Sequence, residues 1–352
     1  MKRHLLFLAA LLIVNLAASA QKKFSVYAVG FYNQENLFDT CHDEGKKDYE
    51  YLPNKGWNGM KYTNKLRNMS KALADMGTDV LPNVGCAFIG LSEVENHKVL
   101  DALVDQAPLK ARNMKYVHIE GPDRRGIDCA LLYNPSLFSV KNVKLLPYVQ
   151  ELAKDSAFFT RGFLTVRGEM AGDDVAVIVC HWPSRFSGPF YRESAARQVK
   201  VIKDSLLNVN QEMKIFVMGD MNDDPVNKSM HVYLQAKPEI SQVGAGDMYN
   251  PWYNVLAKEG KGTLFYSGNW NLFDQIVITP NLLNKDAKKK DYSSLKYWKS
   301  HIFRRDYLIQ QEGQYKGAPL RTTAGGRWLN GYSDHLPVVM YLCLLYTSPS
   351  PR

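Results

Sequence analysis

Charged and amide side chains stand directly beside the apolar segments of this chain, where strands are expected to begin or end. Glu93, His181 and Asp220 follow such segments, whereas Asp274 and Asp334 precede them. If the later strands run antiparallel to the earlier ones, these side chains meet at one edge of the fold. So many ionisable groups are costly at strand ends unless they bind something. The sequence therefore predicts a functional site at this edge.

The residue types in this set suit metal-assisted attack on a phosphodiester. Mg²⁺ binds oxygen ligands, usually one or two carboxylates completed by water and by the substrate's phosphate. Glu93 is the best candidate ligand, and Asn33 and Asp334 are expected to bind directly or through water. Mn²⁺ or Ca²⁺ are alternatives to Mg²⁺. The metal ion would polarise the phosphoryl oxygen and stabilise developing charge.

The remaining members of the set suit proton transfer. Asp220 is expected to orient or deprotonate the attacking water, and Asn222 to hold a phosphate oxygen or the nucleophile. His335 is expected to neutralise the pentacovalent phosphate or to serve the leaving group, with Asp274 holding its ring in orientation.

The patterns that position these side chains alternate strands with helices, without a repeat or a domain break. Strands are expected over residues 24–32, 86–91, 127–133, 163–170, 175–180, 215–218, 275–279 and 337–342. Helices are expected over residues 64–76, around 99–103 and over 192–207. The late strands lack long helices between them, which favours a mixed sheet over a doubly wound parallel one. Residues 285–330 are expected to form an irregular insertion rich in basic and aromatic residues.

Five short blocks carry a more specific signal, and they stand in a fixed order along the chain. The blocks are Asn33-Gln-Glu-Asn36, Ser92-Glu93, His181-Trp-Pro-Ser-Arg185, Gly219-Asp220-Met-Asn222 and Ser333-Asp334-His335. Together they resemble the signature blocks of the endonuclease/exonuclease/phosphatase superfamily, which includes deoxyribonuclease I and exonuclease III. The resemblance implies an α/β fold, a four-layer α/β sandwich in which two mixed β-sheets pack face to face with helices outside.

The resemblance also implies residue roles. The matching motifs assign to Asn33, Glu93, Asp220, Asn222, Asp334 and His335 the roles given above. His181 is similar to the second histidine of the deoxyribonuclease I branch, with Asp128 as its expected carboxylate partner. Many relatives carry asparagine before this histidine, where this chain has Cys180, and a cysteine there is expected to pack behind the site.

Each assignment has a purely structural alternative. Asn33 would simply close a strand, since asparagine favours turns, and Glu93 would be an acid in the first turn of a helix. The segment from Asp220 to Pro225 would be an Asx-rich turn, and His181 a core histidine. Asp334 with its neighbour would be a solvated turn.

Basic side chains offer weaker candidates. Arg185 is the one arginine expected to contact phosphate, because Arg192 and Arg197 are expected on a solvated helix face. The aromatic and basic residues of the 285–330 segment suit stacking on nucleic acid. Packing of that segment is an equal alternative.

The two ends of the chain differ from the rest. Residues 1–20 combine a basic start, an apolar run and a small-residue cleavage site, which is typical of a secretory signal peptide. The catalytic domain is then expected over residues 21–342, in a protein exported to the periplasm or beyond the cell. Residues 343–352 are interpreted as a non-native tail. A membrane anchor and a natural tail are the respective alternatives.

Composition and motifs limit the functions to consider. The chain has 352 residues and a formal net charge of +9, which suits an anionic partner such as nucleic acid. We expect a metal-dependent phosphodiester hydrolase, foremost a secreted nuclease acting as an endonuclease, monomeric and without stable membrane insertion. The alternatives are a phosphatase or phospholipid phosphodiesterase acting on a phosphorylated small molecule or lipid, and a non-catalytic binding protein. The GxSxG, P-loop and HExxH motifs are absent.

Overall fold

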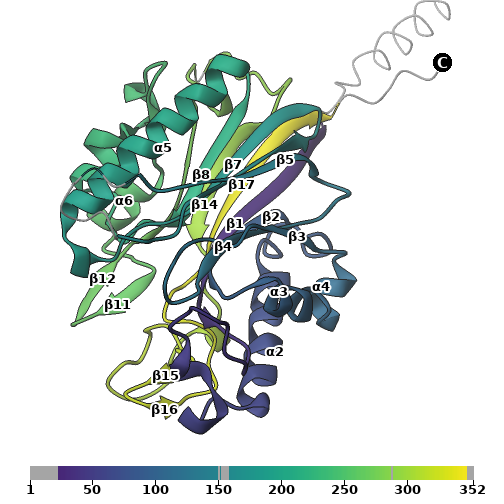
Figure 1. The fold of residues 1–352 in the computed structure, drawn as a ribbon. Coiled ribbons are helices and arrows are strands. Elements are labelled where there is room, and N and C mark those ends of the chain that lie inside the picture. Colours follow the sequence, from purple (N-terminus) through teal and green to yellow (C-terminus); the bar gives the residue numbers. More distant parts are fainter. Residues whose placement is uncertain (1–22, 150, 152–157, 287, 347–352) are drawn as a thin grey trace, which may run out of the picture.

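The computed structural model describes residues 23–149, 151, 158–286 and 288–346 (Figure 1). The segment expected to be a signal peptide, residues 1–20, lies outside the described residues, as does the end of the expected tail, residues 347–352. Among the described residues, no helix is both long enough and apolar enough to cross a membrane.

Two large β-sheets form the centre of the molecule. The first sheet has six strands in the order β14-β17-β1-β2-β4-β3. Its strands are β14 (Lys296–Ile302), β17 (Val338–Tyr346), β1 (Lys23–Leu37), β2 (Cys86–Val94), β4 (Asp128–Tyr133) and β3 (Lys115–His118). The second sheet has seven strands in the order β5-β6-β7-β8-β13-β10-β9. Its strands are β5 (Ser139–Leu146), β6 (Phe163–Met170), β7 (Asp173–His181), β8 (Lys214–Asp220), β13 (Asp274–Ile278), β10 (Met248–Tyr249) and β9 (Ala236–Lys237).

Helices and two small hairpins complete the fold. The helices are α2 (Gly59–Asp75), α3 (His97–Val104), α4 (Ala107–Ala111), α5 (Pro189–Val209) and α6 (Trp252–Ala257). The hairpins pair β11 (Leu264–Tyr266) with β12 (Asn269–Asn271), and β15 (Thr323–Ala324) with β16 (Arg327–Trp328). Short 3₁₀ or π segments connect several of these elements.

Side chains of β8 show why the two sheets form a sandwich. Every residue of this strand is buried, because one face packs on the other sheet and the opposite face packs on a helix. Phe216 and Met218 belong to the hydrophobic cluster between the sheets, whereas Ile215 and Val217 belong to the cluster beneath α5. Successive side chains of a strand point to opposite faces, so one apolar run fills two cores.

The layers follow from three hydrophobic clusters. One fills the space between the sheets, a second joins the first sheet to α2 and α3, and a third joins the second sheet to α5. Figure 1 shows α5 on one side of the sheets and α2, α3 and α4 on the other. The expected four-layer α/β sandwich of two mixed sheets is therefore confirmed.

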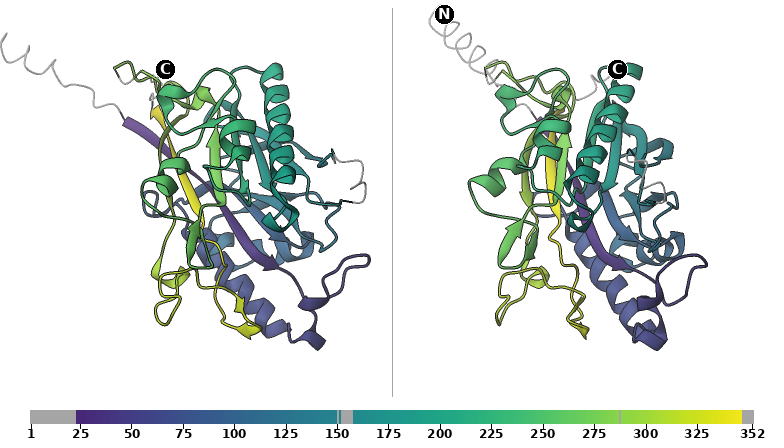
Figure 2. Two further views of the ribbon diagram at one scale, coloured as in Figure 1. Left: turned by 90° about the vertical axis from the view of Figure 1, so that its left-hand side faces the viewer. Right: turned by 60° about the vertical axis from the view of Figure 1, so that its left-hand side comes forward.

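Strand directions bring the predicted site residues to one edge. Strand β1 pairs parallel with β2, and β7 pairs parallel with β8. The late strands run the other way, because β17 is antiparallel to β1 and β13 is antiparallel to β8. In Figure 2 the purple β1 and the yellow β17 lie side by side in both views. The start of each late strand consequently lies beside the end of an early one.

The 285–330 segment differs from its prediction. It contains β14, which pairs with β17 and closes one edge of the first sheet. Tyr297 of this strand packs against the cluster between the sheets, and Phe303 is fully buried. Stacking on nucleic acid and packing within the segment were the two alternatives expected for these side chains. Tyr297 and Phe303 are packing residues. An edge strand paired with β17 makes hydrophobic contacts that a solvated insertion does not make.

The last strand extends beyond its predicted end. Strand β17 was expected to stop at residue 342, and it continues to Tyr346 by pairing with the first residues of β1. Leu345 also donates its backbone N–H to the carbonyl oxygen of Tyr292. The boundary drawn between a catalytic domain and a tail at residue 342 thus falls inside the strand. Strand length here depends on the backbone partners that β1 offers, which the local sequence does not reveal.

Candidate active site

Asp220 lies at the centre of the site, between His181 and Asp274 on the two neighbouring strands. Its side chain is buried, and its Oδ2 accepts a hydrogen bond from the amide of Asn33 at 3.0 Å. Its Oδ1 accepts the backbone N–H of Asn222 at 2.8 Å. Burial raises the pKa of Asp220 to about 7, although the charge of a nearby histidine opposes the shift. Asp220 is therefore a carboxylate suited to accept a proton near neutral pH.

His335 is held by a carboxylate on the neighbouring sheet. Its Nδ1 lies 2.7 Å from Oδ2 of the fully buried Asp274, so the ring presents Nε2 to the site. Nε2 lies 3.9 Å from Oδ2 of Asp220 and 3.9 Å from Oδ1 of Asp334. Burial by itself would lower the pKa of His335, but Asp274 and Asp220 outweigh it and raise this pKa well above its ordinary value. Asp274 therefore orients the ring so that Nε2 can donate a proton toward the pocket.

Two carboxylates remain open to the pocket. The side chain of Glu93 is 14% exposed and that of Asp334 is 22% exposed. Glu93 has a φ of 60° and sits where the pairing of β2 with both neighbouring strands shifts register. Such a bulge redirects a side chain, and strained backbone conformations cluster at active sites. Oε2 of Glu93 accepts the backbone N–H of Asn36 at 3.0 Å, which leaves Oε1 toward the pocket.

The donors at this edge fit one hard cation. No cluster of three or more His, Cys, Asp or Glu side chains suited to enclosing a metal ion occurs in the described part of the chain. Mg²⁺ does not require such a cage, because it retains waters and uses one or two carboxylates. Glu93 and Asp334 line the same pocket and would supply those oxygens. The Oδ1 of Asn33 accepts the N–H of Glu35 at 2.8 Å, so this oxygen would contact a metal ion through water or through its second lone pair.

His181 faces the same pocket but lacks the partner predicted for it. Its Nε2 lies 3.6 Å from Oδ2 of Asp220 and 3.7 Å from Oε1 of Glu93. Its buried Nδ1 has no hydrogen-bond partner within the described residues. Burial, together with the nearby Arg161 and Arg125, lowers the pKa of His181 well below its ordinary value. His181 is consequently a neutral imidazole beside two carboxylates.

The pairing of Asp128 with His181 is wrong. Asp128 accepts a hydrogen bond from the backbone N–H of Gly121 and lies 3.0 Å from Nε2 of His118. His118 ends β3, which pairs directly with β4, where Asp128 is the first residue. Neighbouring strands of one sheet therefore satisfy this carboxylate, while His181 belongs to the opposite sheet.

Arg185 is engaged by the protein and does not offer a free cation. Its Nη2 lies 2.7 Å from Oδ2 of Asp224, and its Nη1 donates to Oδ1 of Asn271 at 3.0 Å. Its guanidinium also lies 4.4 Å from the ring centroid of Phe273. The phosphate contact expected of Arg185 is thus replaced by internal contacts. Arg192, expected on a solvated face, is buried and pairs with Asp223 at 2.8 Å.

Asn222 and Cys180 complete the predicted set. Asn222 has a φ of 49° and donates its side-chain amide to the carbonyl oxygen of Trp182 at 3.0 Å. Cys180 is buried in the cluster beneath α5, because adjacent residues of β7 point to opposite faces and His181 takes the face toward the pocket. The cysteine therefore packs behind the site, as expected.

Two arginines lie at the site that the sequence patterns did not indicate. Arg125 lines the pocket, which has a volume of about 400 Å³, and has no ion pair within the described residues. Arg321 bridges Asp334, at 3.1 Å, and the buried Glu35, at 3.4 Å. Both arginines come from loops in which no periodic pattern or motif marks them. Only the packing of these loops against the strand ends reveals their place.

An aspartate–histidine pair and two open carboxylates in one pocket suit acid–base chemistry on a phosphoester. The family model described as "Endonuclease/Exonuclease/phosphatase family" matches residues 28–343. The chain therefore belongs to the endonuclease/exonuclease/phosphatase family, whose members hydrolyse phosphoester bonds. No curated protein sequence matches the chain.

Solved structures share the fold at low sequence identity. An endonuclease/exonuclease/phosphatase family protein from Bacteroides thetaiotaomicron aligns with a TM-score of 0.54 and 14% identity, over 94% of this chain and 100% of that one. D. rerio TDP2, complexed with a single-strand DNA product, aligns with a TM-score of 0.52 and 11% identity, over 90% and 99%. A mannosyl-6-phosphatase of B. thetaiotaomicron aligns with a TM-score of 0.53 and 14% identity, over 90% and 99%.

Proposed function

We propose that this chain is a divalent-metal-dependent phosphodiester hydrolase, and specifically an exported nuclease that acts as an endonuclease. The observation that carries the proposal is the position of Asp220. Its carboxylate is bound by Asn33, lies 3.9 Å from Nε2 of the His335 ring, and adjoins the open carboxylates of Glu93 and Asp334. This arrangement joins a base, an acid and a metal-binding edge in one pocket.

The chain's own groups divide the chemistry among them. Asp220 accepts the proton of the attacking water, and Asn33 keeps its carboxylate turned toward that water. His335, oriented by Asp274, donates a hydrogen bond or a proton from Nε2 on the leaving-group side. Glu93 and Asp334 would hold a divalent cation, Mg²⁺ or alternatively Mn²⁺ or Ca²⁺, which would supply Lewis-acid stabilisation of the phosphoryl charge.

Two further groups recognise the phosphate. The neutral ring of His181 donates one hydrogen bond, and the side chain of Arg125 brings a positive charge that no acid of the described chain pairs with. Hydrogen bonds and charges aimed at a phosphate are strongest where water is excluded, as in this partly buried pocket. Asn222 supports the site from its strained backbone position and anchors Trp182.

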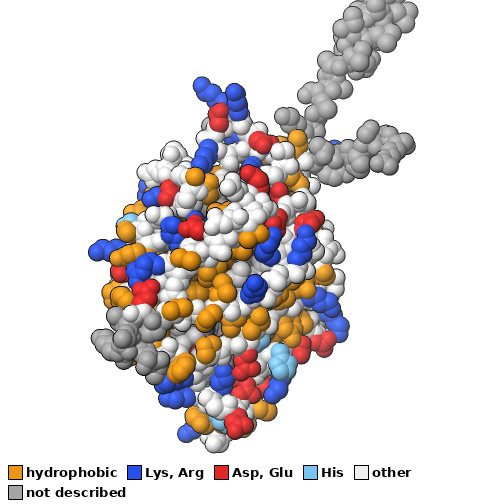
Figure 3. Space-filling model, turned by 45° about the horizontal axis from the view of Figure 1, so that its top comes forward, with side chains coloured by type: hydrophobic (Ala, Val, Ile, Leu, Met, Phe, Trp, Pro, Cys, Tyr) orange, Lys and Arg blue, Asp and Glu red, His pale blue; other side chains and the backbone are white. Residues whose placement is uncertain are grey.

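Nucleic acid is the substrate that charge favours. The formal net charge is +9 for the whole chain and +7 without residues 1–20, which contain Lys2 and Arg3 and no acid, and this excess supports contact with a polyanion. On the face shown in Figure 3, Lys and Arg side chains are mixed with Asp and Glu and do not form one basic patch. Contacts with nucleic acid are therefore proposed along the pocket edge rather than across this face. The single-strand DNA product bound by the similar D. rerio TDP2 supports the same substrate class.

A phosphatase is the second candidate. The similar mannosyl-6-phosphatase shares the fold to the same degree as the DNA-bound relative, and a pocket of about 400 Å³ accommodates a phosphorylated small molecule. A phospholipid phosphodiesterase has less support, although Tyr266 at the tip of the β11–β12 hairpin is 68% exposed. Export, directed by residues 1–20, and a monomeric state are part of the proposal.

The experiment compares the protein with its Glu93→Ala and His335→Ala variants. Supercoiled plasmid, single-stranded RNA, a chromogenic phosphodiester and mannose 6-phosphate are each incubated with Mg²⁺ or with EDTA. Metal-dependent nicking that both variants lose supports the nuclease. Turnover of mannose 6-phosphate alone would move the proposal to a phosphatase. A folded protein that turns over none of these substrates would contradict catalysis and favour a binding protein.

A further inference from the structure

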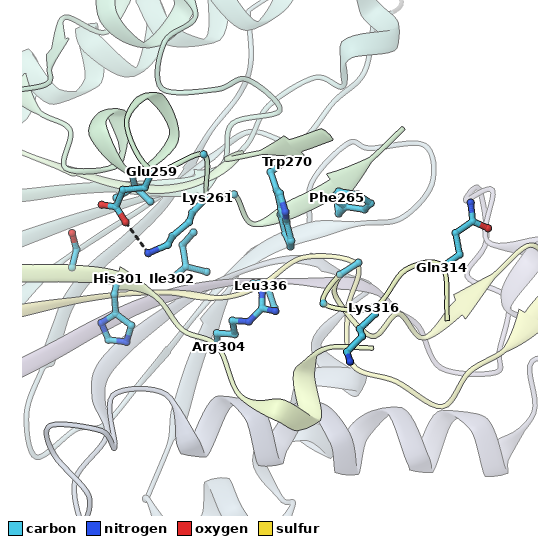
Figure 4. A pocket seen from close by; sticks show the side chains of 16 residues that line it. Glu259, Lys261, Phe265, Trp270, His301, Ile302, Arg304, Gln314, Lys316 and Leu336 are labelled. Atoms are coloured by element: carbon cyan, nitrogen blue, oxygen red, sulfur yellow. Dashed lines mark hydrogen bonds and ion pairs between the residues drawn. The ribbon is translucent and has the colours of Figure 1, made fainter. Parts of the chain in front are cut away.

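A second cavity lies behind the β11–β12 hairpin, and none of the residues that line it has a role in the proposed catalysis. It has a volume of about 600 Å³ and is bounded by the hairpin, the end of β14 and the loop at residues 314–318. Figure 4 shows Phe265 and Trp270 projecting from the hairpin on one side, with Leu336 beneath them. The two aromatic ring centroids are 5.2 Å apart at an interplanar angle of 58°. The hairpin side of the cavity is therefore an aromatic wall.

One β-bridge places this cavity next to the active site. Leu264 of β11 bridges to His335, and both of these residues line the catalytic pocket. Their successors, Phe265 and Leu336, line the second cavity. Consecutive residues of extended chain point to opposite sides. The catalytic pocket and the second cavity consequently lie back to back across a single bridge.

A groove leads from one pocket to the other around the hairpin. This groove has a volume of about 640 Å³ and reaches Asp334 and Arg321 at the catalytic end. At its other end it shares Phe265, Gln314 and Ala318 with the second cavity. A substrate longer than one phosphoester is thus able to occupy the site and the cavity together.

The cations of the cavity are not balanced by the protein. Arg304 and Lys316 line it, both are exposed, and neither has an ion pair within the described residues. The other basic groups are occupied, since Lys261 pairs with Glu259 at 2.8 Å and His301 lies 3.2 Å from a carboxylate oxygen of Asp79. Figure 4 shows Arg304 and Lys316 below the aromatic wall. The free charges therefore face the same space as the rings.

We propose that this cavity is a second subsite for nucleic acid, which binds a nucleotide beyond the scissile phosphate. A base stacks on Phe265 and Trp270, and a phosphate of the same strand contacts Arg304 and Lys316. Stacking on aromatic rings is indifferent to sequence because every base has a π-face. A neutral sugar or an acyl chain would leave both cations without a counter-charge. The inference rests on the proposed phosphodiesterase function and specifies the substrate class of that site.

The first test separates long from short substrates. Phe265→Ala and the double variant Arg304→Glu/Lys316→Glu are compared on an eight-residue oligothymidylate and on bis(p-nitrophenyl) phosphate, which is too small to reach the cavity. We expect kcat/KM for the oligothymidylate to fall about tenfold in Phe265→Ala, which is the scale of one lost base stack. A similar fall is expected in the double variant, which loses a phosphate contact. The small ester should be hydrolysed at the unchanged rate. The salt dependence of log KM for the double variant should become shallower by about 0.7, since the contact with one phosphate is lost.

A matched control and a binding measurement complete the design. Lys289→Glu reverses an exposed lysine that precedes β14, whereas Arg304 follows it, and this control should behave as the unmodified protein. Binding of fluorescently labelled oligothymidylate in EDTA is measured by anisotropy, so that the subsite is tested without turnover. If the protein binds this probe in a variant-sensitive way but cleaves no phosphodiester, the proposed function fails while the subsite stands.

Three outcomes would overturn the subsite. An equal loss on both substrates would show that the variants disturb the catalytic pocket or the fold. Unaltered cleavage and binding of oligothymidylate would show that the cavity takes no part. Binding to phosphatidylcholine vesicles that Phe265→Ala abolishes, without an effect on oligothymidylate, would assign the aromatic wall to a lipid surface.

Discussion

The side-chain amide of Asn33 donates a hydrogen bond to Asp220 over 3.0 Å, although 187 residues separate the two in the chain. Asn33 belongs to β1 in the first sheet, and Asp220 ends β8 in the second sheet. The proposed base and the residue that orients it therefore come from different sheets. The geometry of the site depends directly on how the two sheets pack.

Removing this amide should impair catalysis much more than stability. Asn33→Ala is expected to lower kcat/KM about 10²-fold, because a displaced catalytic group costs this much, and to lower the unfolding free energy by about 1 kcal/mol. The matched control is Asn250→Ala, which removes a buried amide that donates to Gln275 at 2.9 Å, outside the pocket. Urea titrations and steady-state kinetics on a chromogenic phosphodiester provide both values. Equal kinetic losses in the two variants would contradict a specific role for Asn33.

Asp274 should act only through His335. Asp274→Asn keeps the shape of the side chain but removes the charge that stabilises the protonated ring, and kcat is expected to fall about 10²-fold to 10³-fold. His335→Ala should cost at least as much. In the double variant the loss should match that of His335→Ala alone, because residues that act as a unit are not additive. Additive losses would assign Asp274 a separate function.

Chelation should abolish activity, and the apparent metal affinity should depend on Glu93. With Glu93→Gln we expect the Mg²⁺ concentration for half-maximal activity to rise at least about tenfold, since a carboxylate ligand is lost. Glu95→Gln is the control, because Glu95 is buried and accepts the backbone N–H of Asp39 at 2.7 Å, away from the pocket. Activity that persists in EDTA would refute the metal-dependent mechanism.

Arg185 and Arg125 should show opposite effects. Arg185 binds other parts of the protein, so Arg185→Met is expected to lower the unfolding free energy by about 1 kcal/mol and to change KM little. Arg125 lines the pocket without an ion pair in the described chain, so Arg125→Met should raise KM about tenfold and leave stability unchanged. Thermal unfolding and substrate titration distinguish the two. The reverse result would restore Arg185 as the phosphate contact.

Lys65 should make stability depend on pH. This fully buried side chain donates to Oγ1 of Thr322 and to the carbonyl oxygen of Tyr332, and burial lowers the pKa of Lys65 from 10.5 to about 8. Between these two values the unfolded chain binds the proton and the folded chain does not, so the contribution of Lys65 to stability rises with pH. Below pH 8 the charged, desolvated group is least favourable.

The measurement compares the protein with Lys65→Met by urea unfolding at pH 7.5, 9 and 10. The stability of the protein relative to this variant should increase over the series by roughly 1–3 kcal/mol. Lys55→Met, at an exposed lysine, should show no such trend. Parallel stability curves for the protein and Lys65→Met would mean that Lys65 keeps its ordinary pKa in the folded state.

Local patterns in the sequence were sufficient for the class of fold and for bringing most members of the candidate site to one edge. The apolar runs around Ile89, Val177 and Val217 are buried on both faces of a sheet, and such runs are recognisable without any tertiary information. Glu93, His181 and Asp220 stand where those runs end. Strand period and strand ends are properties of a few consecutive residues, which is why the prediction succeeded there.

Tertiary structure decided which partner each of these groups has. Asp128 pairs with His118, Arg185 is neutralised by Asp224, and Arg321 reaches Asp334. These pairings depend on strand order, on register and on loops packed from distant parts of the chain. Which side chains pair depends on many long-range contacts. The residue pattern indicates only the local structural preference of each segment.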